Sequence, residues 1–161
     1  MKLLVKKTFL LIVAAGLFSI GCSLLNSKSE TQIKLKTDQN SYIADTSSVI
    51  KLTVTNNTDN PVYFVCTGQI YLEELNGKNV EHSWMVHGFE KCLSRNPIEE
   101  NKPVTFDISF NSIFLRDWFS TAQFDKNVDY RLRMDLYKTE EIDQLISEKN
   151  RVSNTFEIIQ E

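Results

Sequence analysis

The stretch VDYRLRMDLY, residues 128–137, decides the fold, because apolar and polar side chains alternate along it without interruption. The apolar positions are Val128, Tyr130, Leu132, Met134 and Leu136. A period of two places one set on each side of an extended chain, which predicts a β-strand with one buried and one solvated face. On the solvated face, Arg131 and Arg133 stand beside Asp129 and Asp135. We therefore expect a wet surface of mixed charge there and no anion site.

The same alternation recurs along most of the chain. Further strands are predicted near residues 33–35, 50–54, 62–67, 70–75, 80–86, 104–110 and 152–158. Between two of them, Asn76-Gly77 is typical of a hairpin turn, and the short polar side chains of residues 56–60 favour another turn. Seven or eight short strands predict an all-β domain of two antiparallel sheets packed face to face. A closed barrel is the competing arrangement.

Two segments interrupt the alternation. Residues 112–124 place large apolar side chains at irregular spacing, which favours one helical turn between the sheets. Residues 139–149 place Ile142, Leu145 and Ile146 at helical spacing behind a threonine suited to capping. We expect a short helix in this second segment.

The first 21 residues have the composition of an export signal. Lys2, Lys6 and Lys7 form a positively charged start, and Thr8–Ile20 is an apolar segment. Its thirteen residues would rise only about 20 Å as a helix, against a hydrocarbon core of roughly 30 Å. Residues 1–21 are therefore predicted to be a signal peptide and not a membrane-spanning helix.

The end of this segment, Gly21-Cys22, resembles the lipobox of bacterial lipoproteins, although Ser19 stands where that motif usually has an aliphatic residue. The resemblance implies that Cys22 becomes the mature N-terminus and carries a diacylglyceryl group and a further acyl chain such as palmitate. Several chains hold a protein stably at a membrane. Ser23 implies the outer membrane if the host is Gram-negative. A plain secretory signal with an incidental cysteine is the alternative.

Residues 22–31 are polar after Leu25 and form the expected lipidated N-terminus and tether, followed by one domain over residues 32–161. Three of the 18 basic residues lie in the signal, so 15 oppose 21 acidic residues and the mature side chains sum to −6. This net charge gives the chain little attraction for nucleic acid or an anionic lipid surface.

The segments IKLKTDQNSYIADTSSVIKLTVTNNTDNPVYF (33–64), VDYRLRMDLY (128–137) and SNTFEI (153–158) resemble the immunoglobulin-like domain of bacterial surface lipoproteins, many of unassigned function. The resemblance covers roughly residues 31–160. It implies an immunoglobulin-like antiparallel β-sandwich in the cell envelope, anchored through its lipid.

The number of cysteines predicts one disulfide bond. If Cys22 is acylated, Cys66 and Cys92 remain as an even pair in an oxidising compartment. The alternative is two reduced cysteines, one buried and one on a loop.

The sequence offers little for catalysis. The three glycines after residue 21 are too scattered for a phosphate-binding loop, and no nucleophile-elbow or zinc-protease motif occurs. A metal site from His82, His87 and Cys92 would compete with the disulfide for the thiolate. We expect no enzyme activity, no cofactor and no metal.

Aromatic side chains are the candidate interaction surface. Trp84, Phe89, Trp118 and Phe119 lie near the irregular segments, where partner surfaces often present aromatic residues. The competing interpretation is that these side chains plug the ends of the sandwich. We expect a non-catalytic binding or scaffolding module for an envelope component; the alternative is a protease-inhibitor-like module using residues 88–102 as its loop.

We predict that Cys22→Ala moves the protein from the membrane fraction to the soluble exported fraction, or leaves an uncleaved precursor, because the acyl chains have no attachment site. Fractionation and labelling with a palmitate analogue measure this. A parent protein without label, fractionating like the variant, would contradict the lipid anchor.

Overall fold

The structure, a computed structural model, describes residues 33–45, 47–88, 92–110 and 128–159. They form ten strands: β1 (Ile33–Thr37), β2 (Ser41–Ile43), β3 (Val49–Asn56), β4 (Val62–Val65), β5 (Ile70–Asn76), β6 (Asn79–His87), β7 (Arg95–Ile98), β8 (Val104–Ser109), β9 (Asp129–Met134) and β10 (Phe156–Ile159). One 3₁₀ turn, η1 (Glu148–Asn150), is the only helical element within these ranges. The all-β prediction is therefore confirmed.

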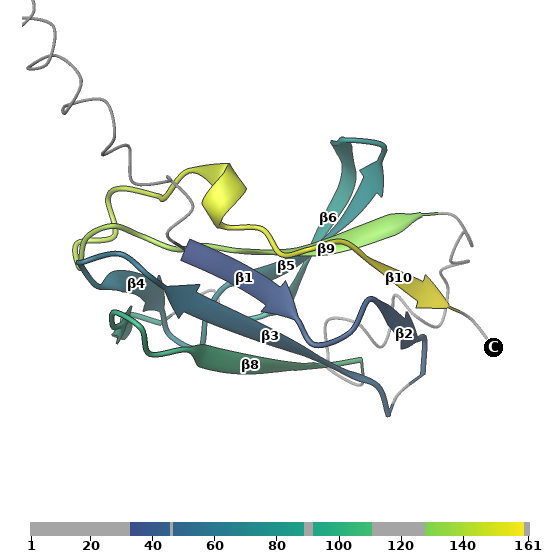
Figure 1. The fold of residues 1–161 in the computed structure, drawn as a ribbon, viewed down its shortest axis with the longest axis horizontal. Coiled ribbons are helices and arrows are strands. Elements are labelled where there is room, and N and C mark those ends of the chain that lie inside the picture. The colour runs from purple at the N-terminus through teal and green to yellow at the C-terminus, as the bar shows by residue number, and fades with distance from the viewer. Residues whose placement is uncertain (1–32, 46, 89–91, 111–127, 160–161) are drawn as a thin grey trace, which may run out of the picture. The chain divides into compact units, whose positions relative to one another are not determined.

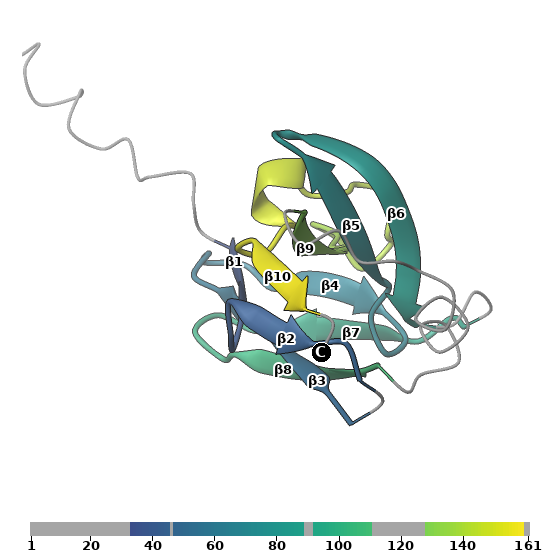
Figure 2. The ribbon, with the colours of Figure 1, turned by 90° about the vertical axis from the view of Figure 1, so that its right-hand side faces the viewer.

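The strands form three sheets (Figure 1). A three-stranded sheet has the order β1-β3-β8, a five-stranded sheet the order β2-β10-β9-β5-β6, and β4 pairs with β7. All named pairings are antiparallel except β2 with β10, which is parallel. Figure 2, turned by 90°, shows the three-stranded sheet on one side of the domain and β5 and β6 on the other.

The apolar positions of the alternation meet in one core shared by all three sheets. Along β1 burial alternates strictly, with every second residue buried, and β9 shows the same pattern with buried Tyr130, Leu132 and Met134. The largest fully buried side chains are Phe110, Phe156, Ile50, Leu52, Ile70, Leu72, Ile98, Ile108, Leu132, Met134 and Leu136. Burial of this apolar surface is the main favourable contribution to folding.

The structure contains two strands that the alternation did not predict. β2 has only three residues, too few for a period of two to be recognised. β7 contains Pro97, and a proline cannot donate to a sheet ladder, so it argues against a strand in the sequence. Pairing with β4 along its whole length nevertheless makes β7 a strand.

The predicted hairpin is confirmed: β5 pairs with β6, and Asn76 lies opposite Asn79. Gly77 has a φ of +62° at the first central position, which a type II′ turn requires. Val80 and Val86 have the same parity in the sequence, but Val80 is 40% exposed and Val86 is buried. The register of the β5–β6 pair shifts between Glu74 and Leu75. At such an irregularity, alternation in the sequence no longer indicates which side of the sheet a residue faces.

The short helix expected over residues 139–149 does not form. Ile142 has a φ of +57°, outside the helical region, and the hydroxyl of Thr139 donates to the carboxylate of Asp143 at 2.7 Å. Only η1 overlaps the segment. The helical turn expected over residues 112–124 lies outside the described residues.

Asn56, at the end of β3, is a fully buried polar side chain. Its Nδ2 donates to the carbonyl oxygens of Asn60 at 2.8 Å and Ile98 at 2.9 Å. Its Oδ1 accepts from the backbone N–H of Thr58 at 3.0 Å and from the Thr58 hydroxyl at 2.7 Å. The side chain therefore fixes the turn predicted here and ties it to the end of β7.

We predict that Asn56→Ala lowers the free energy of unfolding by about 2–3 kcal/mol, because buried carbonyl and N–H groups lose their partners. Urea denaturation measures the change. The neighbouring exposed Asn57 is the matched control, and Asn57→Ala should change stability by less than about 0.5 kcal/mol. Equal effects of the two substitutions would contradict the role of Asn56.

Candidate functional site

A row of partly or largely exposed apolar side chains crosses four neighbouring chain segments. It consists of Pro97, Tyr63, Tyr137 and Leu145, called here the tyrosine row. Pro97 lies opposite Tyr63 in the β4–β7 pair, Tyr137 lies opposite Tyr63 in an isolated bridge, and Leu145 lies opposite Tyr137 in another. Directly opposed residues in antiparallel pairs point to the same side, so the four side chains share one surface.

Backbone hydrogen bonds of Tyr137 hold the row together. Its N–H donates to the carbonyl of Tyr63 at 2.8 Å, and the N–H of Tyr63 donates back at 2.9 Å. On the other side, the N–H of Ile146 donates to Leu136 O at 2.9 Å. These bonds join the β4–β7 pair to the chain that leaves β9, so the row spans a continuous sheet surface.

Polar and aromatic groups border the row. On β5, Tyr71 lies opposite Arg133, and the guanidinium stands 4.1 Å from the centre of the Tyr71 ring, a cation–π contact. Burial and the nearby Asp135 carboxylate raise the pKa of both Tyr71 and Tyr137 above the ordinary value. Both hydroxyls therefore remain neutral at physiological pH and can donate hydrogen bonds.

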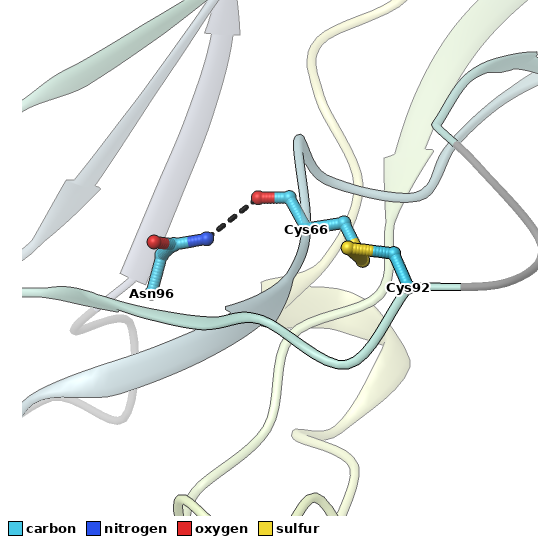
Figure 3. The surroundings of a disulfide bond; sticks show 3 residues. All are labelled: Cys66, Cys92 and Asn96. Atoms are coloured by element: carbon cyan, nitrogen blue, oxygen red, sulfur yellow. Dashed lines mark hydrogen bonds between the residues drawn. A yellow bond between two sulfur atoms is a disulfide. The ribbon is translucent and has the colours of Figure 1, made fainter.

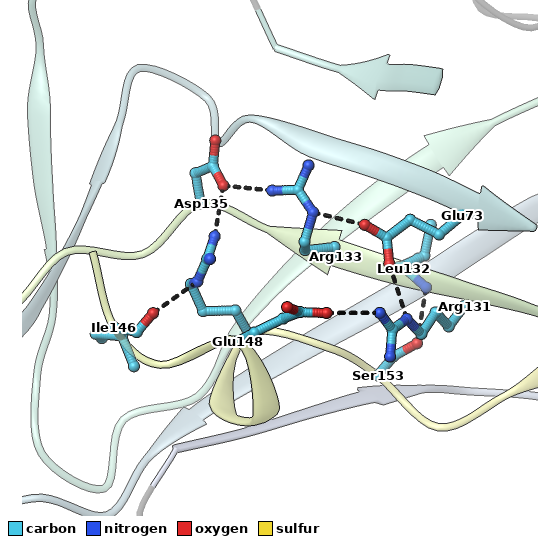
Figure 4. A network of polar contacts seen from close by, with 9 residues as sticks. Glu73, Arg131, Leu132, Arg133, Asp135, Ile146, Glu148 and Ser153 are labelled. Carbon is cyan, nitrogen blue, oxygen red and sulfur yellow. Dashed lines mark hydrogen bonds and ion pairs between the residues drawn. The ribbon is translucent and has the colours of Figure 1, made fainter. Parts of the chain in front are cut away.

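Two residues from Tyr71 along β5, Glu73 is only 4% exposed, and two arginines bind its carboxylate (Figure 4). Arg131 Nε donates to Oε2 at 2.8 Å, and Arg133 Nε donates to Oε1 at 2.6 Å. Arg131 also pairs with Glu148 at 3.0 Å. The expected mixed charge of this face is present, but its full solvation was wrong, because the arginine side chains are only 17% and 20% exposed.

Asp135 continues this network toward the segment that holds Leu145. Its Oδ1 accepts from Arg133 at 2.6 Å and from Arg151 at 2.8 Å, and Arg151 Nε donates to the carbonyl of Ile146 at 2.8 Å. Burial alone would lower the pKa of Arg133, but the carboxylates of Glu73 and Asp135 outweigh this effect, and the pKa is raised above its ordinary value. The guanidinium therefore stays charged. Charged side chains thus fix the segment beside the tyrosine row.

The other end of the row is fixed by a disulfide between Cys66 and Cys92 (Figure 3). Their Cα atoms are 5.8 Å apart across 26 positions, and the predicted pairing is confirmed. Cys66 follows β4 with a φ of +61°, and its carbonyl accepts from Asn96 Nδ2 at 2.6 Å. In the chain-entropy account such a link contributes roughly 3–4 kcal/mol, and here it holds β4 and β7 together.

The aromatic surface expected from the sequence is described only at Trp84. This residue is half-buried, lies opposite the buried Leu72, and its ring centre is 5.4 Å from that of His82. Phe89, Trp118, Phe119 and the lipidation residue Cys22 lie outside the described residues.

The segment expected as an inhibitory loop, residues 88–102, is structured in its described part. β7 occupies its middle, and Ile98 is fully buried. The described residues contain no group of three or more His, Cys, Asp or Glu side chains suited to a metal ion. Nor does any helix among them have the length and apolar character needed to cross a membrane.

Sequence reasoning missed the tyrosine row, although Tyr137 falls among the polar positions of the alternating stretch 128–137. Large aromatic side chains at solvated positions were the available signal. Their meeting depends on the two isolated bridges at Tyr137, which join segments far apart in the chain and leave no local pattern.

Comparison with known proteins found similar solved structures but no matching family or curated protein. Among solved structures, a β-glucosidase from Listeria innocua in complex with glucose is similar over 81% of this chain, with 15% identity and a TM-score of 0.33. A GH3 exo-β-xylosidase, XlnD, is similar over 81% of this chain, with 15% identity and a TM-score of 0.37. The matched region covers only 16% of the β-glucosidase chain and 17% of the xylosidase chain. TM-scores at this level establish neither fold nor activity.

We predict that Glu73→Gln lowers the free energy of unfolding by about 3 kcal/mol, because two partly buried guanidinium groups lose their counter-charge. Thermal or urea denaturation measures this. Glu81→Gln, on the exposed part of β6, is the control and should be close to neutral. An unchanged midpoint in Glu73→Gln would show that the network contributes nothing to stability.

Proposed function

We propose that this protein is a lipid-anchored cell-envelope module that binds another envelope component without catalysis, using the tyrosine row as its contact surface. The signal-like N-terminus and Cys22 support the anchor. The exposed row on a rigidly held sheet supports the binding role, and this single observation carries the proposal.

We propose further that the domain is an immunoglobulin-like sandwich. The orders β1-β3-β8 and β2-β10-β9-β5-β6 correspond to the A-B-E and A′-G-F-C-C′ strands of that fold, in which a variable-type domain adds C′ to the G-F-C sheet. The parallel pairing of β2 with β10 agrees with A′ beside G. Unlike antibody domains, the disulfide joins the ends of β4 and β7 and does not cross between the sheets.

The composition of the row suits protein recognition. Tyrosine combines a large apolar ring with a hydroxyl, loses little conformational entropy on binding and is enriched at interfaces. Leu145 is 48% exposed, more than a core residue would be, while its backbone is fixed by the bridge to Tyr137. Preorganised apolar groups reduce the entropic cost of association.

A second candidate, a protease-inhibitor-like module, has one observation in its favour. Leu93 is 89% exposed and directly follows the disulfide-bonded Cys92, so an apolar side chain stands at a covalently fixed position. The strand β7 begins two residues later and limits the length of any loop that could enter a protease.

The test compares two exposed apolar residues at different places. A photo-crosslinking amino acid at position 145 should give one dominant envelope adduct, and one at position 43 should not; Ile43 is 41% exposed and lies on β2. We predict that Leu145→Glu reduces capture of this partner at least tenfold, whereas Ile43→Glu leaves it unchanged. Circular dichroism should be the same for both variants.

Equal adducts at positions 145 and 43, or none at 145, would contradict the tyrosine row as the contact surface. A protease as the dominant adduct at position 93 would favour the inhibitor candidate instead.

A further inference from the structure

The outer face of the three-stranded sheet carries three exposed lysines, Lys34, Lys36 and Lys51. Along β1 the lysines alternate with buried Ile33 and Leu35, so they point away from the core. We call this outer surface, which also carries Thr53, Thr105 and Asp107, the lysine face. Lys36 lies opposite Thr53, and Thr53 lies opposite Thr105, so uncharged threonines fill the centre.

The charge of this face is opposite to that of the chain. The mature side chains sum to −6, but the lysine face has three positive charges and one negative charge, Asp107 opposite Lys51. At its border, the Asp38 carboxylate accepts from the Tyr42 hydroxyl at 2.6 Å and from the backbone N–H of Lys51 at 3.0 Å. The negative net charge of the chain therefore does not prevent this positively charged surface from attracting anions.

The lysine face also begins close to the proposed anchor in the sequence. Eleven peptide bonds separate Cys22 from Ile33. A fully extended chain of that length spans at most about 40 Å, and a flexible one has an end-to-end distance of roughly 20 Å. β1 is the first described strand after this tether, so the anchor confines its lysines near the bilayer. The attraction of anionic lipids reaches about one Debye length, roughly 8–10 Å.

We infer that the lysine face docks on the anionic phospholipid headgroups of the membrane that holds the lipid anchor. The inference rests on the proposed anchoring at Cys22, because three lysines without a tether give only weak attraction. The three strands are hydrogen-bonded side by side, so the three ammonium groups lie on one side of the same sheet and can approach a membrane together. Docking in this orientation turns the outer surface of the five-stranded sheet, with Tyr71 and Arg133, away from the bilayer.

The experiment uses the acylated, full mature chain reconstituted in vesicles of phosphatidylcholine alone or mixed with phosphatidylglycerol. Amine acetylation followed by mass spectrometry measures the reactivity of each lysine. One surface lysine contributes roughly fivefold to anionic-membrane binding, and the face has a net charge of two after Asp107 is counted. Two net charges at about fivefold each correspond to roughly 25-fold, so we predict that acetylation of Lys34, Lys36 and Lys51 slows by about 25-fold in the mixed vesicles and recovers in high salt.

Lys78, in the exposed turn between β5 and β6, is the internal control and should react equally in both vesicles. In the variant Lys34→Glu/Lys36→Glu, the protection of Lys51 should be lost, whereas Lys78→Glu should leave it intact. Since all the substituted side chains are exposed, the variants should fold like the parent.

The outcomes separate the two proposals. A mature chain that carries no acyl group overturns the anchor and this inference together. An acylated, vesicle-bound chain whose Lys34, Lys36 and Lys51 react equally in both kinds of vesicle overturns this inference and leaves the proposed function standing. Protection that persists in the double variant also overturns it, because the attraction would then not come from these lysines.

Discussion

The burial of one carboxylate constrains much of this structure. Glu73 sits in the middle of β5 with almost no exposure, and a charge in that position is tolerated only when paired and hydrogen-bonded. Arg131 and Arg133 supply the pairing from the neighbouring strand. Their alignment requires the β5–β9 register in which Glu73 lies opposite Arg131. A slip of one residue would turn both arginines toward the apolar core, so the network favours this register over others.

Further charged contacts connect the Glu73 network to the surface segment that follows Tyr137. Arg133 also binds Asp135, Asp135 binds Arg151, and Arg151 reaches the backbone of Ile146. The segment after Tyr137 therefore has a defined path although it contains only one short 3₁₀ turn. The disulfide supplies a comparable restraint on the side of β4 and β7. The tyrosine row is thus held in place by the ion-pair network at one end and by the Cys66–Cys92 disulfide at the other.

Alternation in the sequence predicted most of the fold and little of the site. A period of two identifies which side of a strand is buried, and it did so for β1, β3 and β9. It does not identify what binds the side chains on the other side, so Arg131 and Arg133 were assigned to water, whereas Glu73, Asp135 and Glu148 pair with them. Local helical spacing likewise misled for residues 139–149, because the bridge between Leu145 and Tyr137 and the hydrogen bond from Ile146 to Leu136 override it. The even cysteine pair was predictable because it depends on a count and not on geometry.

The position of Asn56 has a mechanical consequence. In the β1–β3 pair, Asn56 lies opposite Ile33, the first residue of the first strand. A force transmitted along an N-terminal tether would enter the sheet there and would peel β1 away one hydrogen bond at a time, beginning at this pair. The buried amide holds the end of β3 to the turn at Asn60 and to Ile98, so the strand against which β1 is pulled is clasped where the load arrives. Since these bonds run to the turn and to β7 and not to β1, the Asn56 side chain would keep the end of β3 in place while β1 separated from it.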